Sequence, residues 1–139
     1  MDIEHIVSKL VNRFRTRNPF LIAKRLDIQI LYADLGSSSG CYLYLKKHRC
    51  ILLNNSLDEN EQRLVMAHEL GHAVLHRKLN YYFLRNKTYL KLNNYEREAD
   101  TFAAYLLISA DDIEQCNTVE HLAALSGVPE DVAELRVKG

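Results

Sequence analysis

Long apolar runs, net charge and a targeting signal are all missing from this sequence. No apolar stretch approaches the ~20 residues that a helix needs to cross a bilayer. The 18 basic and 18 acidic residues cancel, so no overall field draws the chain to nucleic acid or to anionic lipid. The first residues are acidic and lack the basic start and apolar run of a signal peptide. We therefore expect a cytoplasmic protein with no nucleic-acid or membrane partner.

Cysteine, glycine and proline are also scarce. The three cysteines, Cys41, Cys50 and Cys116, are an odd number without CxxC spacing, which argues against a disulfide framework and favours reduced thiols. Cys41 and Cys50 are predicted to be small hydrophobic residues on strands, placed to face each other across a hairpin. Five Gly and two Pro, with 47% apolar and 26% charged residues, indicate an ordinary globular composition.

The length of the chain fits one domain. With 139 residues, folding can bury roughly two-thirds of the surface that the unfolded chain exposes. The sequence contains no internal repeat and no linker long enough to divide it. We expect a single domain over residues 1–139, with a helical C-terminal tail at about 109–139.

Hydrophobic periodicity predicts helices on both sides of a short run of strands. The predicted helices cover 2–16, a short segment capped by Asn18 and beginning at Pro19, 59–77 and 94–108, followed by two short helices separated by residues 127–129. The predicted strands cover 28–32, 41–45 and 50–53, and residues 80–93 are predicted to be irregular. The segment Ser56-Leu57-Asp58-Glu59 has the form of a capping box that opens the helix at 59. These elements indicate an α+β fold, in which a small, largely antiparallel sheet of about three strands packs on helix 59–77 and further helices complete the domain.

The strongest chemical signal is an HExxH motif, His68-Glu69-Leu70-Gly71-His72, in the middle of the predicted helix 59–77. At about 100° per residue, two His four apart lie one turn above each other, so both rings can reach one metal ion. Glu69 lies beside that stripe, where it can act as general base on a water in the open metal position. The motif predicts a zinc peptidase in which His68 and His72 hold Zn2+.

The surroundings of the motif strengthen this interpretation. Apolar residues cover nearly every side of the helix, so it should be buried, and two His and a Glu are costly there unless something pairs with them. A metal ion supplies that pairing. Gly71 should cost ~1 kcal/mol relative to Ala in a helix, which indicates that another segment, such as a strand, packs tightly against it.

A zinc site of this type needs a third protein ligand. His76 continues the stripe, but on a straight helix it lies about 12 Å from His68, so it is interpreted as a C-terminal cap or surface residue. Glu96 and Asp100 are four apart on the next helix and share a face with small residues that allow close approach to the HExxH helix. We therefore predict Glu96 as the third ligand and Asp100 as the acceptor from the outer ring nitrogen of one His. Glu98 falls on the opposite side, and we expect it to be solvated.

Four tyrosines lie between or on the helices that carry these ligands, namely Tyr81, Tyr82, Tyr89 and Tyr95. One hydroxyl among them could stabilise the oxyanion of a tetrahedral intermediate. The sequence does not choose among them, and core packing is the favoured role for each.

Two segments carry a family resemblance. His68-Glu69-Leu70-Gly71-His72-Ala73-Val74-Leu75-His76 and Glu96-Arg97-Glu98-Ala99-Asp100-Thr101-Phe102-Ala103-Ala104-Tyr105-Leu106-Leu107 closely resemble the ImmA/IrrE metallopeptidases. The segments Asn18-Pro19-Phe20, Asp34-Leu35-Gly36-Ser37 and Ile51-Leu52-Leu53-Asn54 extend the resemblance over roughly residues 1–108. Asp100 replaces the Asn of many relatives and brings the chain nearer the ExxxD signature of gluzincins.

The resemblance implies a zinc-dependent endopeptidase whose substrate is a helix-turn-helix transcriptional repressor. Such enzymes occur on bacterial mobile elements and in stress responses, where a single cut in the repressor releases the genes that it silences. Composition and spacing do not indicate that substrate.

Two other interpretations are possible: a non-catalytic binding module whose zinc is structural, and a DNA-binding regulator. A purely structural zinc site has no need of Glu69, and structural sites use four protein ligands rather than three. Residues 119–129 and the helix after them resemble a DNA-binding helix-turn-helix in spacing. However, residues 109–139 hold seven acidic and two basic residues, a charge that repels phosphate, so a packing role is favoured over DNA contact.

Overall fold

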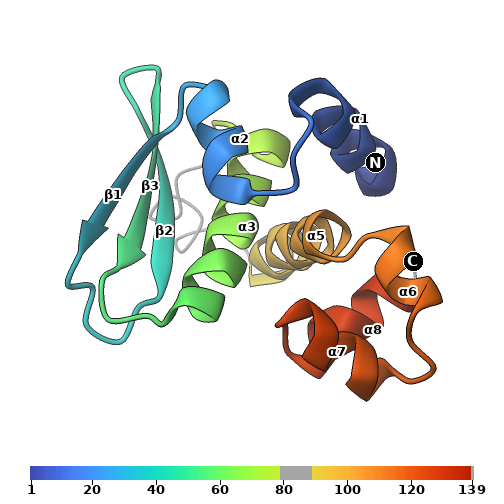
Figure 1. The fold of residues 1–139 in the computed structure, drawn as a ribbon. Helices are drawn as coiled ribbons and strands as arrows, with labels where there is room; N and C mark the ends of the chain where they lie inside the picture. Colours follow the sequence, from blue (N-terminus) through green and yellow to red (C-terminus); the bar gives the residue numbers. More distant parts are fainter. Residues whose placement is uncertain (79–88, 139) are drawn as a thin grey trace.

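The computed structural model describes residues 1–78 and 89–138, which form helices around a three-stranded sheet (Figure 1). In chain order the elements are α1 (Ile3–Phe14), α2 (Pro19–Arg25), β1 (Gln29–Ala33), β2 (Gly40–Leu45), β3 (His48–Asn54), α3 (Glu59–Leu75), α5 (Tyr89–Leu107), α6 (Ala110–Glu114), α7 (Val119–Ser126) and α8 (Glu130–Lys138). The α+β class and the three strands are confirmed, with strand ends shifted by one or two residues.

The sheet has the strand order β1-β3-β2 and is mixed. β2 and β3 form an antiparallel hairpin through a turn in which Lys46 and Lys47 both have positive φ, the backbone geometry typical of a tight two-residue connection. β3 lies between β2 and β1 and runs parallel to β1. The expected facing of Cys41 and Cys50 is wrong, because Cys41 is paired with Leu52 and Cys50 with Leu43.

The helix boundaries follow local capping, with two differences from the sequence prediction. Asn18 caps α2 and Pro19 opens it, as predicted. α3 begins at Glu59 as predicted, but its capping box is formed by Asp58 and Glu61 rather than by the segment starting at Ser56. Residues 89–93, predicted to be irregular, belong to α5; the rest of that segment, 80–88, lies outside the described residues.

Helix α3 lies at the centre of the fold, between the sheet and α5 (Figure 1). Its middle is buried on all sides, which explains why apolar residues surround the HExxH motif. Gly71 permits the close approach of α5: a Cβ atom at this position would lie 3.1 Å from Phe102 Cβ and 3.2 Å from the Cα and carbonyl oxygen of Ala99. The tightly packed neighbour expected at Gly71 is therefore a helix rather than a strand.

Substitution of Gly71 should destabilise the protein. Gly71→Val adds bulk where backbone atoms of α5 are already in close contact, and overpacking of this kind costs about 1–3 kcal/mol of unfolding free energy. Helix propensity alone predicts the opposite sign, because Val is slightly better than Gly in a helix. Urea unfolding of the two proteins measures the difference. An unfolding free energy equal to or above that of the wild type would contradict the close approach.

The C-terminal region packs against α5 mainly through α8, and three arginines from different parts of the chain bind the end of α5. This region contains α6, a short helix missed from the sequence, as well as the two predicted helices α7 and α8. Val132 and Ala133 of α8 are buried in the core. Arg17, Arg63 and Arg136 donate hydrogen bonds to backbone carbonyls of residues 105–108 at the end of α5, where a helix leaves carbonyl groups without partners.

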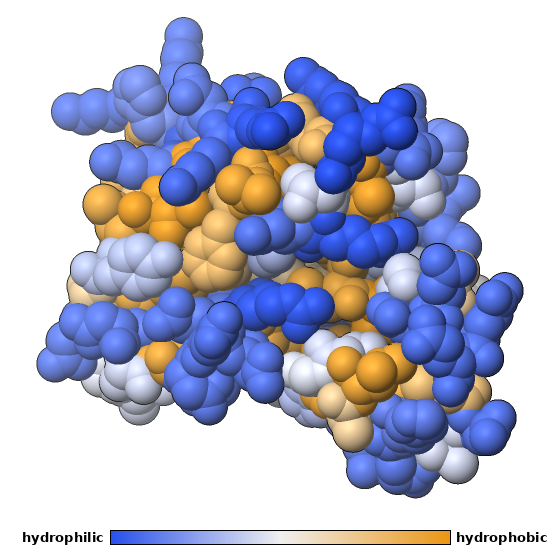
Figure 2. Space-filling model, in the orientation of Figure 1, coloured by the Kyte–Doolittle hydropathy of each residue, from blue (hydrophilic) through white to orange (hydrophobic). Residues whose placement is uncertain are grey.

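Polar side chains cover most of the surface seen in Figure 2, and apolar surface gathers over the sheet and α2. Large exposed apolar residues include Leu21 of α2 and Leu31 and Tyr32 of β1. Exposed apolar residues of this number are normal for a folded protein. Among the described residues, no helix combines the length and apolar character that a bilayer span requires.

Candidate metal centre

Two successive turns of α3 and one turn of α5 place nitrogen and oxygen donors together. The ring centroids of His68 and His72 lie 4.9 Å apart. Glu96 of α5 places Oε1 2.7 Å from His72 Nε2 and Oε2 3.3 Å from His68 Nε2. The candidate donor atoms of these three residues all lie within 4.8 Å of one another, so a single ion could contact all of them.

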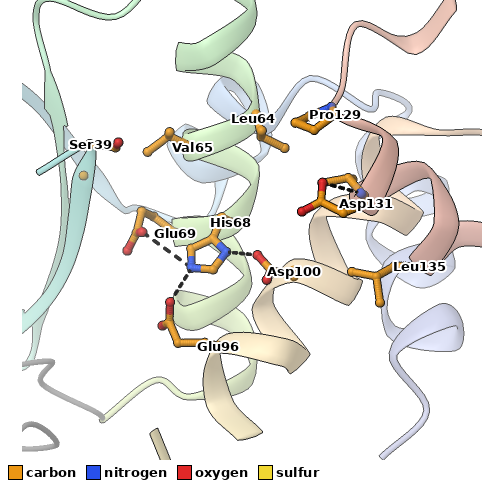
Figure 3. Close-up of a pocket in the computed structure, with 12 residues that line it drawn as sticks. Ser39, Leu64, Val65, His68, Glu69, Glu96, Asp100, Pro129, Asp131 and Leu135 are labelled. Atoms are coloured by element: carbon orange, nitrogen blue, oxygen red, sulfur yellow. Dashed lines mark hydrogen bonds and ion pairs between the residues drawn. The ribbon is translucent and has the colours of Figure 1, made fainter. Parts of the chain in front are cut away.

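Two further carboxylates flank the rings. Asp100 Oδ1 lies 2.7 Å from His68 Nδ1, on the side of the ring away from Glu96. Glu69 Oε2 lies 3.9 Å from His68 Nε2, and the backbone N–H of Tyr42 in β2 donates to the Glu69 carboxylate. Figure 3 shows Glu69, Glu96 and Asp100 around the His68 ring. The structure thus brings together all five residues that the sequence singled out.

His76 and Glu98 form a contact that the sequence did not predict. His76 is the C-cap of α3, as one interpretation had it, but it is buried rather than at the surface. Its Nδ1 lies 3.0 Å from His72 Nδ1, and its Nε2 lies 2.8 Å from Glu98 Oε1. Glu98 is partly exposed, and its carboxylate also contacts the buried His76. Tyr95 packs edge-on against His76, with ring centroids 4.7 Å apart.

Burial and close charges shift the pKa values of these groups. Burial alone would lower the pKa of His68, but hydrogen bonds to Asp100 and Glu96, together with the charge of Glu69, raise it to about 10. Burial disfavours ionisation of Glu96, yet hydrogen bonds from the two rings hold the pKa of Glu96 below its usual value. Burial raises the pKa of Glu69, and the charges of His68 and His72 partly offset this. The site therefore favours positive charge between the rings and Glu96.

The ring contacts require more protons than neutral imidazoles carry. Five contacts join the nitrogens of His68, His72 and His76 to one another or to carboxylate oxygens. Each contact needs one N–H between its two atoms, whereas three neutral imidazoles carry three ring protons in total. Two positive charges are therefore missing if all three rings stay neutral.

The contacts of His68 with Asp100 and of His72 with His76 indicate where the missing positive charge belongs. With the ring proton of His68 directed to Asp100 and that of His72 directed to His76, the nitrogens without a proton are His68 Nε2 and His72 Nε2. Both of these nitrogens face Glu96. One divalent cation supplies the same charge as the two protons and binds to free nitrogen lone pairs. The donor set therefore fits a divalent metal ion.

The cluster opens into two cavities. The larger, of about 360 Å3, is lined on one side by His68, Glu69, Glu96 and Asp100 and on the other by residues of the C-terminal region (Figure 3). Its apolar lining comes from Leu64 and Val65 of α3, from Pro129 and from Val132 and Leu135 of α8. The smaller cavity, of about 160 Å3, lies against β2 and is lined by Ser38, Gly40, Cys41, Glu69, His72 and Glu96. Gly40, Glu69 and Glu96 border both cavities.

Sequence reasoning missed three contributors to this site. The contribution of α8 depends on how the tail folds back, which no local pattern reveals. The backbone N–H of Tyr42 has no sequence signal because every residue except proline carries one. The contact between His76 and Glu98 had a partial signal, since His76 follows His72 by four residues, but the end of α3 redirects its ring.

Comparison with known proteins gives matches over most of the chain. Residues 23–138 match the family described as the IrrE N-terminal-like domain, a peptidase family. The chain is 33% identical to "Uncharacterized immunity region protein 2" of Bacillus phage phi105, over 96% of this chain and 88% of that protein. It is 28% identical to "Metallopeptidase ImmA" of Bacillus subtilis (strain 168), over 97% of this chain and 83% of that protein.

Proposed function

Because the chain belongs to the ImmA/IrrE family of metallopeptidases, we propose that it is a zinc-dependent endopeptidase that cuts a helix-turn-helix repressor at a single site. The observation that carries the proposal is the convergence of two imidazoles and one carboxylate beside a second, buried carboxylate. The family is consistent with this arrangement, because its members are metal-dependent peptidases. Two parts of the proposal go beyond family membership: that the metal ion is zinc, and that the substrate is a repressor.

Zinc is the ion that we assign to His68, His72 and Glu96. Two imidazoles and one carboxylate form the ligand set of catalytic zinc sites, which leave a position open, whereas structural sites are closed by four ligands. When bound, zinc supplies a Lewis acid that acidifies water and polarises the scissile carbonyl. Asp100, with Oδ1 2.7 Å from His68 Nδ1, would accept the ring proton there and so leave His68 Nε2 free to bind the ion.

Glu69 is the general base in this proposal. It accepts the proton of the attacking water and delivers that proton to the leaving amine. Its backbone hydrogen bond from Tyr42 fixes the carboxylate beside the ligands, and its raised pKa brings its proton affinity nearer to that of a base working at neutral pH. Its oxygen lies 3.9 Å from His68 Nε2, so it is close to the ligand atoms without joining the convergent donor group.

We propose that an extended substrate segment pairs with β2. The strand order makes β2 an edge strand, and an added segment can pair with such an edge through main-chain hydrogen bonds. Gly40, the first residue of β2, borders both cavities, so a paired segment would pass the cluster with space for side chains on either side of the scissile bond. The apolar walls contributed by α3 and α8 favour an apolar side chain in the larger cavity.

The repressor is proposed from relatives and not from the cleft. One relative is named as a protein of a phage immunity region, and another is named ImmA. Main-chain pairing reads few side chains, and a small cleft offers limited selectivity. Docking of the rest of a folded partner is therefore the source of selectivity that we propose.

Zinc-loaded protein should cut the repressor encoded beside its own gene once and leave unrelated unfolded proteins intact. The expected products are two fragments whose masses sum to that of the repressor plus one water, measured by mass spectrometry. The Glu69→Gln protein, under the same conditions, is the control for contaminating proteases. Broad digestion of the unrelated proteins, with the repressor untouched, would indicate a general peptidase and defeat the proposed substrate.

A further inference from the structure

Two contacts of the buried His76, beside the proposed zinc ligands, have no role in the reaction described above. The side chain of His76 is 2% exposed and lies with Nδ1 3.0 Å from His72 Nδ1. Its other nitrogen, Nε2, lies 2.8 Å from Glu98 Oε1. The Tyr95 ring packs edge-on against His76 and limits its rotation. Glu98, His76 and His72 thus form a continuous line of contacts that leads from α5, through the end of α3, to Nδ1 of His72, the ring nitrogen opposite the proposed ligand atom Nε2.

The hydrogen-bond roles along this line are determined by chemistry. An imidazole binds a metal ion through a nitrogen lone pair, so coordination through His72 Nε2 leaves the ring proton of His72 on Nδ1. That N–H can only donate to His76 Nδ1, which must then lack a proton and accept. The single ring proton of neutral His76 is therefore on Nε2, where it donates to the Glu98 carboxylate.

We propose that Glu98 and His76 are positioning residues that select the metal-binding tautomer of His72. The proposal rests on the proposed function, because it takes His72 Nε2 as a zinc ligand. Glu98 acts on His72 through His76: its carboxylate fixes the tautomer of His76, and His76 fixes the tautomer of His72. His72 thus has a counterpart to the direct Asp100 contact of His68, with one extra imidazole inserted between ligand and carboxylate.

Loss of the acceptor at position 98 removes this selection. The His76 proton is then free to occupy Nδ1, where it would face the Nδ1 proton of His72. Two donors cannot share one hydrogen bond, so His72 would move its own proton to Nε2, the nitrogen that the metal needs. Zinc must then compete with that proton, and its affinity falls.

The direct test is the protonation pattern of the rings in the zinc-loaded wild-type protein. Two-bond proton–nitrogen correlation spectra of protein with 15N-labelled histidine distinguish a proton on Nδ1 from one on Nε2. We expect His72 to carry its proton on Nδ1 and His76 to carry its proton on Nε2. A His76 proton on Nδ1 would overturn the proposal without affecting the assignment of zinc.

The second test compares two substitutions that remove the same charge. Glu98→Gln keeps an oxygen that accepts from His76 Nε2, whereas Glu98→Leu has no acceptor. Outer hydrogen-bond partners of metal ligands typically change metal affinity by about 10- to 100-fold. Chelator competition should therefore show zinc bound about 10- to 100-fold more weakly by Glu98→Leu, with Glu98→Gln close to the wild type.

Each outcome of this comparison is informative. Equal weakening of both variants would mean that charge, and not the hydrogen bond, is responsible, and no weakening of either would mean that the line of contacts is inert; both results overturn the proposal. Because Glu98 is partly exposed, neither variant should prevent folding, and circular dichroism of the two proteins checks this. A wild-type protein that binds no zinc would instead overturn the proposed function itself.

Discussion

Glu69→Gln is expected to abolish peptide cleavage while zinc remains bound. The three convergent donor residues are unchanged in this variant, and the amide oxygen of Gln can still accept the backbone hydrogen bond from Tyr42. What is lost is the group that takes a proton from water, because an amide has no useful basicity. General acid–base groups contribute about 100- to 10,000-fold, so kcat/KM should fall by at least about a hundredfold.

The measurement pairs zinc content with cleavage rate on the same samples. Zinc per protein molecule should be equal in the wild type and in Glu69→Gln, and only the rate should differ. Glu59→Gln provides a matched control, since it makes the same chemical change in the exposed first turn of the same helix and should leave both quantities unaltered. Wild-type turnover by the Glu69→Gln protein would rule out Glu69 as the base.

Glu96→Ala is expected to lose most of its zinc affinity. Its carboxylate lies 2.7 Å from His72 Nε2 and 3.3 Å from His68 Nε2, so its removal would take away one of the three proposed ligands and the negative charge that would balance the ion. Structural zinc sites with four ligands bind with about 10–16 kcal/mol, so the loss of one ligand should weaken binding by about a hundredfold or more. Competition with a chromophoric chelator at fixed pH measures the change.

Glu98→Ala is the matched comparison for Glu96→Ala. It removes an identical side chain from the same helix, two residues away, but the carboxylate that it removes reaches His76 and not the convergent donors. The sequence alone predicts no effect, whereas the structure predicts a loss smaller than that of Glu96→Ala. Equal zinc affinities for the two variants would reverse the assignment of the third ligand.

Much of the candidate site could be predicted from the sequence because its geometry is local. The spacing of four between His68 and His72 places both rings on one face of any α-helix, wherever that helix lies in the fold. The same periodicity separates Glu96 and Asp100 from Glu98 on the next helix. These predictions require only that the two segments be helical and that their small residues meet.

The parts that could not be predicted depend on contacts between distant segments. The start of α5 was placed too late because Asn93 and Asn94 are poor helix formers, and propensity is a weak guide when tertiary contacts extend a helix. The parallel pairing of β1 with β3 follows from where β3 inserts, which no strand pattern encodes. The orientation of His76 depends on the C-cap geometry at the end of α3.

The close contact at Gly71 has a consequence for the choice of ion. Zinc sites require ligand distances within about 0.2 Å of their preferred values. The histidines belong to α3 and Glu96 to α5, so the separation of these two backbones sets the size of the opening between the donors. A methyl group at position 71 would push the helices apart by a few tenths of an ångström, which is similar to that tolerance. Gly71, which has no side chain to bind a metal, therefore limits the ionic radius that the donor atoms of His68, His72 and Glu96 can accommodate.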